Sequence, residues 1–380
     1  MSNPSSDGSR PTEALRRATP ADNTALCEVF RRVTMDADLH LAVERDPDYF
    51  ALYDLQGCPY YAMAFDMDGK VEASGSFVAR DAWLGGDSPG RIGYACDLRL
   101  TPAVRGGRFL GEWMGVGFRD AARTIGFDYA YTAVIASNRA AMKALAERSP
   151  RYPGKPVYTP HSRFRILNVL FTFKKSPRPS AFRVRPATID DLAIITDRLR
   201  ADHRHRPFGY VIGDATLPGT LARWPGLRIE DFLLAFDGGD RLVGVTAVWN
   251  ANPVKRYRVL GYRGQMKVVR AGFNALAFVT GATPLPPPGA LMSYFYLTHT
   301  SVAGDDPAVM AALLDRVYAD RHGKGFTFFS AFVMDDDPMA RAFERYQTTS
   351  LPASLFLMTA PGAAIPTLPV GRPGFEMCLA

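Results

Sequence analysis

A loop rich in glycine and arginine offers the clearest chemistry in this sequence. The stretch Asp97–Gly111 reads as a strand that ends near Leu100, breaks at Pro102 and enters a loop containing Arg105, Gly106, Gly107 and Arg108. An amphipathic helix is expected from about Phe109. Small residues expose backbone N–H groups and a helix N-terminus adds positive potential, so this arrangement can cradle a phosphate group. The alternative is a plain strand-to-helix turn that the glycines ease.

The surrounding residues predict the strands and helices that would hold this loop in place. Thr19 is the predicted N-cap of a helix that runs to about Val33, with Pro20 at its first position and Asp22 completing a capping-box pattern. Further strands and helices are predicted at Tyr61–Asp66, Val71–Ala79, Ile92–Leu100, Phe109–Thr124, Phe127–Ile135, Asn138–Glu147 and Val157–Phe173.

The overall composition is typical of a soluble globular protein. The chain has 380 residues, which favours two domains, and it is 47% hydrophobic and 22% charged, which excludes a disordered or fibrous protein. Lys and Arg exceed Asp and Glu by 45 to 38, and the net charge of +7 favours an anionic ligand without requiring nucleic acid.

The cysteines and the N-terminal residues indicate a cytoplasmic protein. The four cysteines are scattered without metal-type spacing, so we expect reduced thiols and neither a disulfide framework nor a metal site. Residues 1–12 are polar and lack the apolar core of a signal peptide. No apolar run is long enough to span a bilayer.

The second part of the chain repeats the first in outline. Val184–Asp191 matches Leu15–Asp22 at an offset of 169 residues, and Ala235–Asp237 repeats Ala64–Asp66 at an offset of 171. Three later matches share an offset of 199 residues, namely Leu297 with Leu98, Gly325-Phe326 with Gly126-Phe127, and Asp337 with Asn138. The change of offset locates an insertion of about 28 residues within 250–290. This self-similarity indicates two copies of one α/β unit.

The repeated unit has the order strand, helix, hairpin, strand, phosphate loop, helix, strand, helix, strand. This order, together with Asp97–Pro102, Arg105–Gly107, the helix from Phe109 and Asn138 after the strand Tyr129–Ile135, resembles the GNAT superfamily of N-acetyltransferases. The resemblance implies an α/β (α+β) protein of two tandem GNAT-like domains. Each domain would have a mixed, mostly antiparallel central sheet flanked by helices.

The expected domain organisation follows from the repeat. A disordered leader, 1–12, precedes an N-terminal acyl-CoA-binding domain, 13–173, and a linker, 174–181. A C-terminal domain, 182–360, carries the insertion at 250–290 and is followed by a Pro-rich tail, 361–380.

The resemblance also implies acetyl-CoA, or another acyl-CoA, as a co-substrate. The cofactor-binding residues that it implies are Leu98, Arg99, Leu100, Arg105, Gly106, Gly107, Arg108, Phe109, Leu110, Gly111 and Asn138. In the family, the loop reads Arg or Gln, two residues, Gly, one residue, and Gly or Ala. Arg105 fits the first position, but Arg108 and Leu110 stand where small residues are expected. The loop is therefore shifted or rebuilt around an extra arginine.

The second copy has lost this loop. At the offset of 199 residues, the arginine and glycine loop becomes Gly304-Asp305-Asp306-Pro307. Carboxylates beside a pyrophosphate repel it. We therefore expect a degenerate C-terminal copy that binds no coenzyme A.

Acyl transfer to an amine needs a proton acceptor for the amine and a proton donor for the leaving thiolate. Asp97 is the first candidate for the base, and the alternative for it is a surface ion pair or a solvated strand end. The tyrosine that family members often carry after the Asn is missing from Ala144–Arg148. Tyr94 or Tyr131 could replace it as the acid, or could simply be packed aromatics. Asn138 could bind cofactor or cap its helix.

The insertion is basic and rich in aromatic residues. No Asp or Glu occurs from Arg241 to Gly304, whereas this stretch contains Lys255, Arg256, Arg258, Arg263, Lys267 and Arg270. Such a patch could face the coenzyme's phosphates, an anionic substrate, a membrane surface or RNA. Alternatively, it is a solvated face that packs against the first domain.

Three functions remain open on the sequence. The first is an N-acyltransferase, most simply an N-acetyltransferase, that acts on a primary amine of an unknown acceptor. The second is a Fem-like aminoacyl transferase that takes its acyl group from tRNA, which the basic insertion favours and the retained loop disfavours. The third is a non-catalytic acyl-CoA sensor or scaffold. The sequence does not decide the acceptor or the acyl length.

Overall fold

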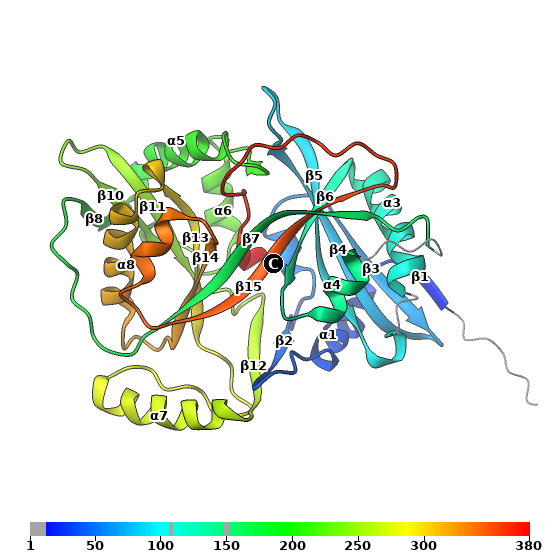
Figure 1. Cartoon of the computed structure of the whole chain (residues 1–380), viewed down its shortest axis with the longest axis horizontal. Coiled ribbons are helices and arrows are strands. Elements are labelled where there is room, and N and C mark those ends of the chain that lie inside the picture. The colour runs from blue at the N-terminus through cyan, green and yellow to red at the C-terminus, as the bar shows by residue number, and fades with distance from the viewer. Residues whose placement is uncertain (1–12, 106–108, 147–151) are drawn as a thin grey trace, which may run out of the picture.

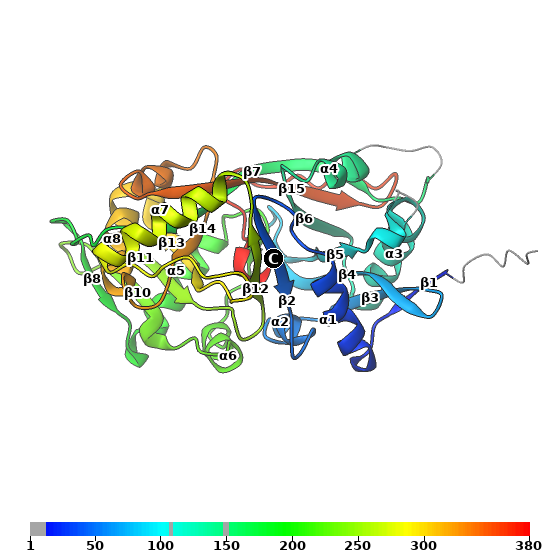
Figure 2. The ribbon, with the colours of Figure 1, turned by 90° about the horizontal axis from the view of Figure 1, so that it is seen from below.

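The structure is a computed structural model of the whole chain, and it describes residues 13–105, 109–146 and 152–380. Its main sheet has thirteen strands. Twelve of them follow the order β1-β3-β4-β5-β6-β15-β7-β14-β13-β11-β10-β8, and β9 (Gly209–Tyr210) pairs with β4. Helices cover the sheet on both sides, and the two halves of the chain lie side by side (Figures 1 and 2). Most neighbours are antiparallel, and the described parallel pairs are β5 with β6 and β13 with β14.

The N-terminal half contains the elements that the sequence predicts. Its strands are β1 (Glu13–Arg17), β2 (Leu39–Glu44), β3 (Tyr60–Met67), β4 (Lys70–Trp83), β5 (Gly90–Leu100), β6 (Tyr129–Ile135) and β7 (Val157–Leu170). Its helices are α1 (Asn23–Arg32), α2 (Ala51–Asp54), α3 (Met114–Ile125) and α4 (Arg139–Ala146). Gly126 ends α3 in the left-handed conformation, φ 70°, as a C-terminal glycine should.

The alternation of side chains on β3 and β4 places helices on both faces of the sheet. Ala62 and Ala64 pack with Leu26, Val29 and Phe30 of α1. Tyr61 and Met63, one residue out of step, pack in the cluster that contains Phe118 and Ala121 of α3. Successive residues of a strand point to opposite faces, so α1 and α3 lie on opposite sides of the same strands.

The C-terminal half has a comparable set of elements. Its strands are β8 (Arg183–Pro186), β10 (Phe232–Phe236), β11 (Leu242–Trp249), β12 (Arg256–Tyr262), β13 (Tyr294–Val302), β14 (Phe328–Met334) and β15 (Thr348–Thr359). Its helices are α5 (Leu192–His203), α6 (Thr216–Arg223), α7 (Gln265–Thr280) and α8 (Pro307–Arg321).

Two local features recur in both halves with nearly the same geometry. Arg16 donates two hydrogen bonds to the carboxylate of Asp22, at 2.9 and 2.7 Å, and Arg185 does the same to Asp191, at 2.7 Å each. Thr19 and Thr188 cap the following turns through matching capping boxes. The repeat seen in the sequence is therefore also a repeat of hydrogen bonds.

The two halves exchange their last strands, which the sequence did not reveal. β7 leaves the N-terminal half and pairs antiparallel with β14, while β15 returns from the C-terminal half and pairs antiparallel with β6. The two exchanged strands also pair with each other from Thr348↔Val169 to Thr359↔Val157. They cross the middle of the molecule in Figure 1 and join both halves into one sheet.

The insertion also links the halves. Its strand β12 pairs antiparallel with β2 of the N-terminal half, where Arg256 and Arg258 both contact the Glu44 carboxylate. Helix α7 follows β12 and lies along the lower edge of the molecule in Figure 1. In the described residues, no helix is both long and apolar enough to cross a membrane.

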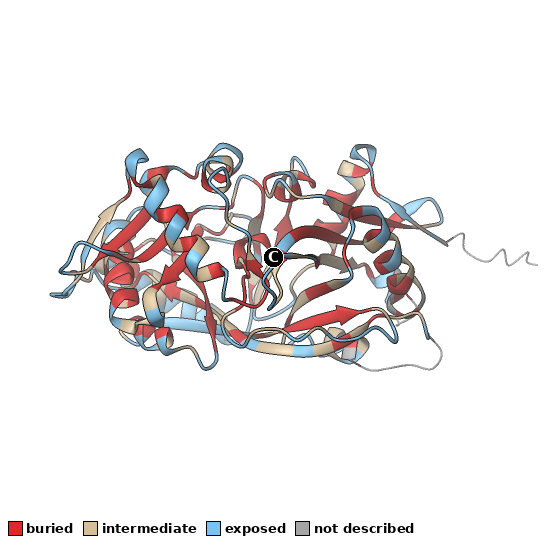
Figure 3. Ribbon diagram, turned by 90° about the horizontal axis from the view of Figure 1, so that it is seen from above, coloured by how far each residue is buried: buried red, intermediate tan, exposed pale blue. Residues whose placement is uncertain are grey.

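Buried residues occur throughout both halves and in the middle of the molecule (Figure 3), and the largest buried cluster is shared by the two halves. It combines side chains of the N-terminal half, such as Leu52 and Tyr94, with Trp224 and Trp249 of the C-terminal half. Phe375, Met377, Cys378 and Leu379 also belong to this cluster. The segment Arg372–Ala380 therefore runs into the centre of the molecule, where Figures 1 and 2 place the last residue.

Candidate active site

The candidate active site lies where β5 and β6 separate. These parallel strands pair from Ile92↔Tyr129 to Ala95↔Thr132, and no pairing between them continues beyond Ala95. β6 remains paired with β15 on its other side, whereas β5 continues along β4 to Leu100. We call the place where the two strands stop pairing the wedge. Backbone N–H and C=O groups that no longer pair across it need other partners, and an extended ligand can supply them.

Asp97 lies at this point of separation, in a left-handed backbone conformation with φ 55°. The β4–β5 register shifts between Ser74 and Ser76, opposite this residue, which identifies a β-bulge. A non-glycine residue with positive φ is uncommon and is found preferentially at functional sites. The Ser74 hydroxyl donates a 3.2 Å hydrogen bond to the Asp97 carbonyl and helps to hold the bulge.

The Asp97 carboxylate is engaged inside the protein. Arg45, whose side chain is fully buried, donates to it at 3.0 Å, and the Tyr53 hydroxyl donates at 2.6 Å. Burial by itself would raise the pKa of Asp97, but the charge of Arg45 and the Tyr53 hydrogen bond outweigh it and lower the pKa. A carboxylate stabilised in this way holds a proton poorly, so its surroundings suit a positioning role better than that of a general base.

Tyr94 and Tyr131, the candidate proton donors, lie next to each other on β5 and β6. Their ring centroids are 4.9 Å apart, and both side chains are buried. Burial raises the pKa of Tyr94 well above its usual value, so its hydroxyl stays protonated. Both residues line a small cavity together with Gln56, Val78, Arg80, Tyr210, Phe375, Glu376 and Leu379. The structure therefore brings the two tyrosines to one cavity. Asp97 lies two residues beyond Ala95, the last residue of β5 that pairs with β6.

The phosphate loop is only partly described. Arg105 is exposed, Gly106, Gly107 and Arg108 lie outside the described residues, and Phe109–Trp113 form a π-helical turn before α3. A Cβ on Gly111 would lie 2.3 Å from the Tyr152 ring, so only glycine lets the turn approach this closely. The predicted helix from Phe109 is thus a wide turn followed by α3.

The remaining cofactor candidates have local partners. Leu98 and Leu100 pack beside the buried cluster of Phe65, Ala73 and Phe109, and the Arg99 guanidinium lies 5.0 Å from the Phe30 ring centroid. The Asn138 side chain accepts a 3.1 Å hydrogen bond from the Ala141 amide. Asn138 therefore caps α4, and its role in cofactor binding stays a prediction.

Several residues at the site were not singled out from the sequence. They are Arg45, Arg80 and Glu376, together with Lys255, which was noted only as one cation of the insertion. Arg80 donates to the backbone carbonyls of Phe208 and Gly374, both at 2.7 Å. The acid-free insertion gave a signal for Lys255, but nothing in the local sequence pattern marks Arg80 or Glu376.

Most of the cationic side chains of the insertion bind carboxylates or carbonyls of the same chain. Arg256 and Arg258 pair with Glu44, Arg263 pairs with Asp36, and Lys255 donates to the carbonyls of Cys378, at 3.0 Å, and Ala380. The insertion therefore offers less free positive charge than its composition indicates. Across the described ranges, no group of three or more His, Cys, Asp or Glu side chains is placed to hold a metal ion.

Comparisons with known proteins identify the fold. No protein-family model and no curated protein matches the chain. Among solved structures, it is similar to a GCN5-related N-acetyltransferase from Sphaerobacter thermophilus, with a TM-score of 0.59, 14% identity, and coverage of 93% of this chain and 98% of the other. It is also similar to Saccharomyces cerevisiae N-myristoyltransferase with bound myristoyl-CoA, with a TM-score of 0.56, 9% identity, and coverage of 93% and 86%.

Proposed function

From the fold of the GCN5-related N-acetyltransferases, we propose that this chain is an acyl-CoA-dependent N-acyltransferase that acts on a primary amine. The observation that carries the proposal is the wedge between β5 and β6, which opens at the Asp97 bulge and leads to the strand–loop–helix unit around Arg105. Acetyl-CoA is the simplest donor, and the similarity to a myristoyl-CoA complex makes a longer acyl-CoA an equal candidate.

The cofactor would lie along the wedge with its pyrophosphate at the loop. We assign the backbone of Leu98–Leu100 to the pantetheine arm, and Arg105 with the Phe109–Gly111 turn to the phosphates. Gly106, Gly107 and Arg108 belong to the same proposed loop and lie outside the described residues. No metal is needed, because backbone amides and arginine supply the positive potential.

In the proposed reaction, the neutral amine nitrogen attacks the thioester carbonyl carbon, and the C–S bond then breaks. The amine loses a proton and the departing thiolate gains one, so the step balances without a redox partner. Tyr94 and Tyr131 are the proposed proton donors, because both line the cavity beside the wedge. Asp97 is proposed to position Arg45 and Tyr53 beneath the wedge, rather than to act as the base.

We propose that only the N-terminal copy binds coenzyme A. In the C-terminal half, Asp306 accepts a 2.8 Å hydrogen bond from Ala308 at the start of α8. This carboxylate occupies the helix N-terminus, where a cofactor phosphate would otherwise bind. A second anion there would be repelled.

Thermal denaturation with acetyl-CoA, a medium-chain acyl-CoA and myristoyl-CoA tests the proposal. At least one of them should raise the melting temperature, and Arg105→Glu should abolish that shift. Arg341→Glu is the matched control, because Arg341 is also exposed but lies in the other half. If none of the three donors shifts the melting temperature at millimolar concentration, the proposed function is wrong.

A non-catalytic acyl-CoA sensor is the second candidate, and the engaged Asp97 carboxylate favours it. Coenzyme binding without release of free thiol, across a panel of polyamines, aminoglycosides, amino acids and lysine peptides, would select this function. The tRNA-dependent alternative has less support, because four of the six cations in the insertion are bound within the chain. Filter binding of tRNA tests it directly.

A further inference from the structure

The C-terminal half has a strand bulge like that of the candidate active site. His299 on β13 has a φ of 51°, close to the 55° of Asp97 on β5. The parallel pairing of β13 with β14 ends at Tyr296↔Ser330, and the pairing of β13 with β11 shifts register between Val245 and Ala247. The second half therefore has the same kind of wedge, and its bulge residue lies 202 positions after Asp97.

A carboxylate from the chain itself occupies this second bulge. Glu376 accepts a 3.0 Å hydrogen bond from the His299 backbone amide and a 2.7 Å hydrogen bond from the Thr298 hydroxyl. Phe375, Glu376 and Met377 also line a small cavity whose other walls come mainly from β13, β14, α8 and the turn at 338–343. The Glu376 carboxylate thus occupies the second wedge at its bulge, and the Asp306 carboxylate caps the N-terminus of α8.

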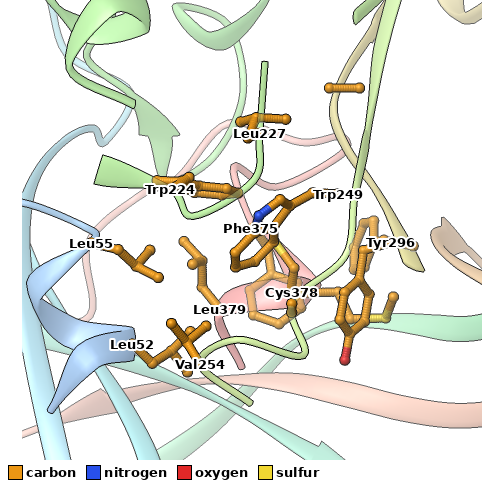
Figure 4. Close-up of a cluster of buried hydrophobic side chains, with 14 of the residues drawn as sticks. Leu52, Leu55, Trp224, Leu227, Trp249, Val254, Tyr296, Phe375, Cys378 and Leu379 are labelled. Carbon is orange, nitrogen blue, oxygen red and sulfur yellow. The ribbon is translucent and has the colours of Figure 1, made fainter. Parts of the chain in front are cut away.

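The same segment forms a wall of the first half's cavity. Phe375, Glu376 and Leu379 line that cavity together with Tyr94 and Tyr131. The Phe375 ring centroid lies 5.9 Å from that of Tyr94 and 5.5 Å from that of Phe332, so one side chain touches both halves. Figure 4 shows Phe375, Cys378 and Leu379 between Leu52 and Leu55 of the first half and Trp249 and Tyr296 of the second.

Charged side chains hold the segment at two further points. Arg80 donates to the Gly374 carbonyl and Lys255 donates to the Cys378 carbonyl. Arg80 is buried, and no carboxylate of the described residues forms an ion pair with it. Burying a cation without a counter-ion is costly, so backbone carbonyls at fixed positions must satisfy it. The placement of the segment is therefore specified by side chains from several strands.

We propose that Glu376 is a positioning residue that occupies the second wedge in place of an acyl group and thereby fixes the wall of the first half's acceptor cavity. We call the hydrogen bonds of Glu376 to Thr298 and His299 the clamp. The clamp is inferred from these contacts alone, whereas its effect on the acceptor depends on the proposed function. In this proposal the C-terminal copy has a structural role, because it holds the segment Arg372–Ala380 that forms a wall of the acceptor cavity in the N-terminal half.

Alkylation of Cys378 tests the clamp without any acyl-CoA. The residue Cys378 is 1% exposed and its Sγ lies 3.7 Å from the Thr298 hydroxyl, so its thiol reacts only when the segment opens. Glu376→Ala should speed its reaction with N-ethylmaleimide about tenfold or more, because two charge-assisted hydrogen bonds are lost. Glu376→Gln keeps acceptor oxygen and should stay within about threefold of the wild type.

Two controls separate opening of the segment from general unfolding. Buried Cys27, in the N-terminal half, should react at its wild-type rate in each variant, as followed by peptide mass spectrometry. Glu344→Ala removes an exposed carboxylate of the C-terminal half, the half that contains Glu376, and should leave Cys378 protected. Gly374→Ala is an independent variant, because its Cβ would lie 2.3 Å from the Phe208 carbonyl oxygen and should expose Cys378 without touching Glu376. Unchanged Cys378 reactivity in Glu376→Ala, with Cys27 still protected, overturns the clamp.

The effect on the acceptor cavity is measured separately. With the amine of the panel that turns over fastest, Glu376→Ala should raise the KM for the amine about tenfold and leave the Kd for acetyl-CoA within about twofold. An equal loss of acetyl-CoA affinity would place the effect in the first wedge and overturn this role. If the wild type turns over no amine, the proposed enzymatic function fails, and Cys378 labelling still decides the clamp.

Discussion

At the scale of single residues, the state of Asp97 determines which chemistry the site can use. The residue lies where β5 and β6 separate, but Arg45 and Tyr53 already satisfy its carboxylate with hydrogen bonds. An acid that a fully buried arginine keeps ionised serves mainly to stabilise the fold, because it neutralises the buried charge. Asp97 was selected from the sequence as a candidate base, but its hydrogen bonds to Arg45 and Tyr53 favour a positioning role.

Asp97→Asn should destabilise the protein by about 3–5 kcal/mol, because it leaves the Arg45 charge buried without its carboxylate partner. Urea denaturation measures this loss, and Asp87→Asn, at an exposed position, is the control. A variant that keeps its stability but loses the acidic limb of the kcat–pH profile, which is the limb that a general base produces, would instead identify Asp97 as the base.

The repeated pairs Arg16–Asp22 and Arg185–Asp191 predict an acid transition. The hydrogen bonds from Arg16 lower the pKa of Asp22 to about 2, and those from Arg185 lower the pKa of Asp191 as well. A carboxyl whose folded pKa lies below its unfolded value, about 3.9, stabilises the fold above that value, and the contribution is lost as the pH falls through the folded pKa. Stability should therefore fall between about pH 4 and about pH 2.

Chemical denaturation across this range tests the origin of the transition. Asp22→Asn should flatten part of the decline, because the variant has no carboxyl to protonate there. Asp190→Asn, beside the second pair but exposed, should leave the decline unchanged. An identical slope in Asp22→Asn and the wild type would show that other carboxyls cause the transition.

At the scale of elements, α3 positions the loop that precedes it, and two of its glycines differ in what they meet. A Cβ on Gly115 would lie 2.3 Å from the Gly154 carbonyl oxygen, whereas one on Gly117 would lie 2.5 Å from the Met63 sulfur. Backbone cannot move aside cheaply, but the end of a methionine side chain can.

Gly115→Ala should therefore cost about 2–3 kcal/mol of stability and weaken acyl-CoA binding, whereas Gly117→Ala should cost less than about 1 kcal/mol. Thermal melts with and without acetyl-CoA measure both effects. Equal costs in the two variants would mean that the segment around Gly154 yields as readily as a side chain.

At the scale of the whole molecule, the exchanged strands make the halves dependent on each other. β7 of the N-terminal half pairs with β14, and β15 of the C-terminal half pairs with β6. The cluster around Phe375 buries further apolar side chains of both halves. The linker 174–181 is mostly exposed and is a suitable site for cleavage.

A protease site placed between Lys175 and Ser176 tests this dependence. After cleavage, the two fragments should elute together in native buffer and separate only in denaturant, because the strand exchange survives the cut. Each fragment expressed alone should fail to fold, since each would lack a central strand. Two independently folded fragments would contradict the exchange.

The local sequence determined much of the architecture. The capping pattern at Thr19, the left-handed glycine at Gly126 and the strand before Arg105 involve neighbouring residues, so their spacing is enough to predict them. The matches between the two parts of the chain indicated a repeated unit for the same reason, and the repeated Arg–Asp pairs accord with it.

Only the tertiary structure decided what surrounds the wedge. Arg45 meets Asp97 across 52 positions, and Glu376 meets His299 across 77. The exchange of β7 with β15 likewise depends on strands that are far apart in the chain. Such contacts form because folding buries apolar surface and satisfies each buried polar group with whichever partner the packing provides. No local sequence pattern indicates which distant residue becomes the partner. The sequence therefore located the loop, and only the fold determined which residues surround it.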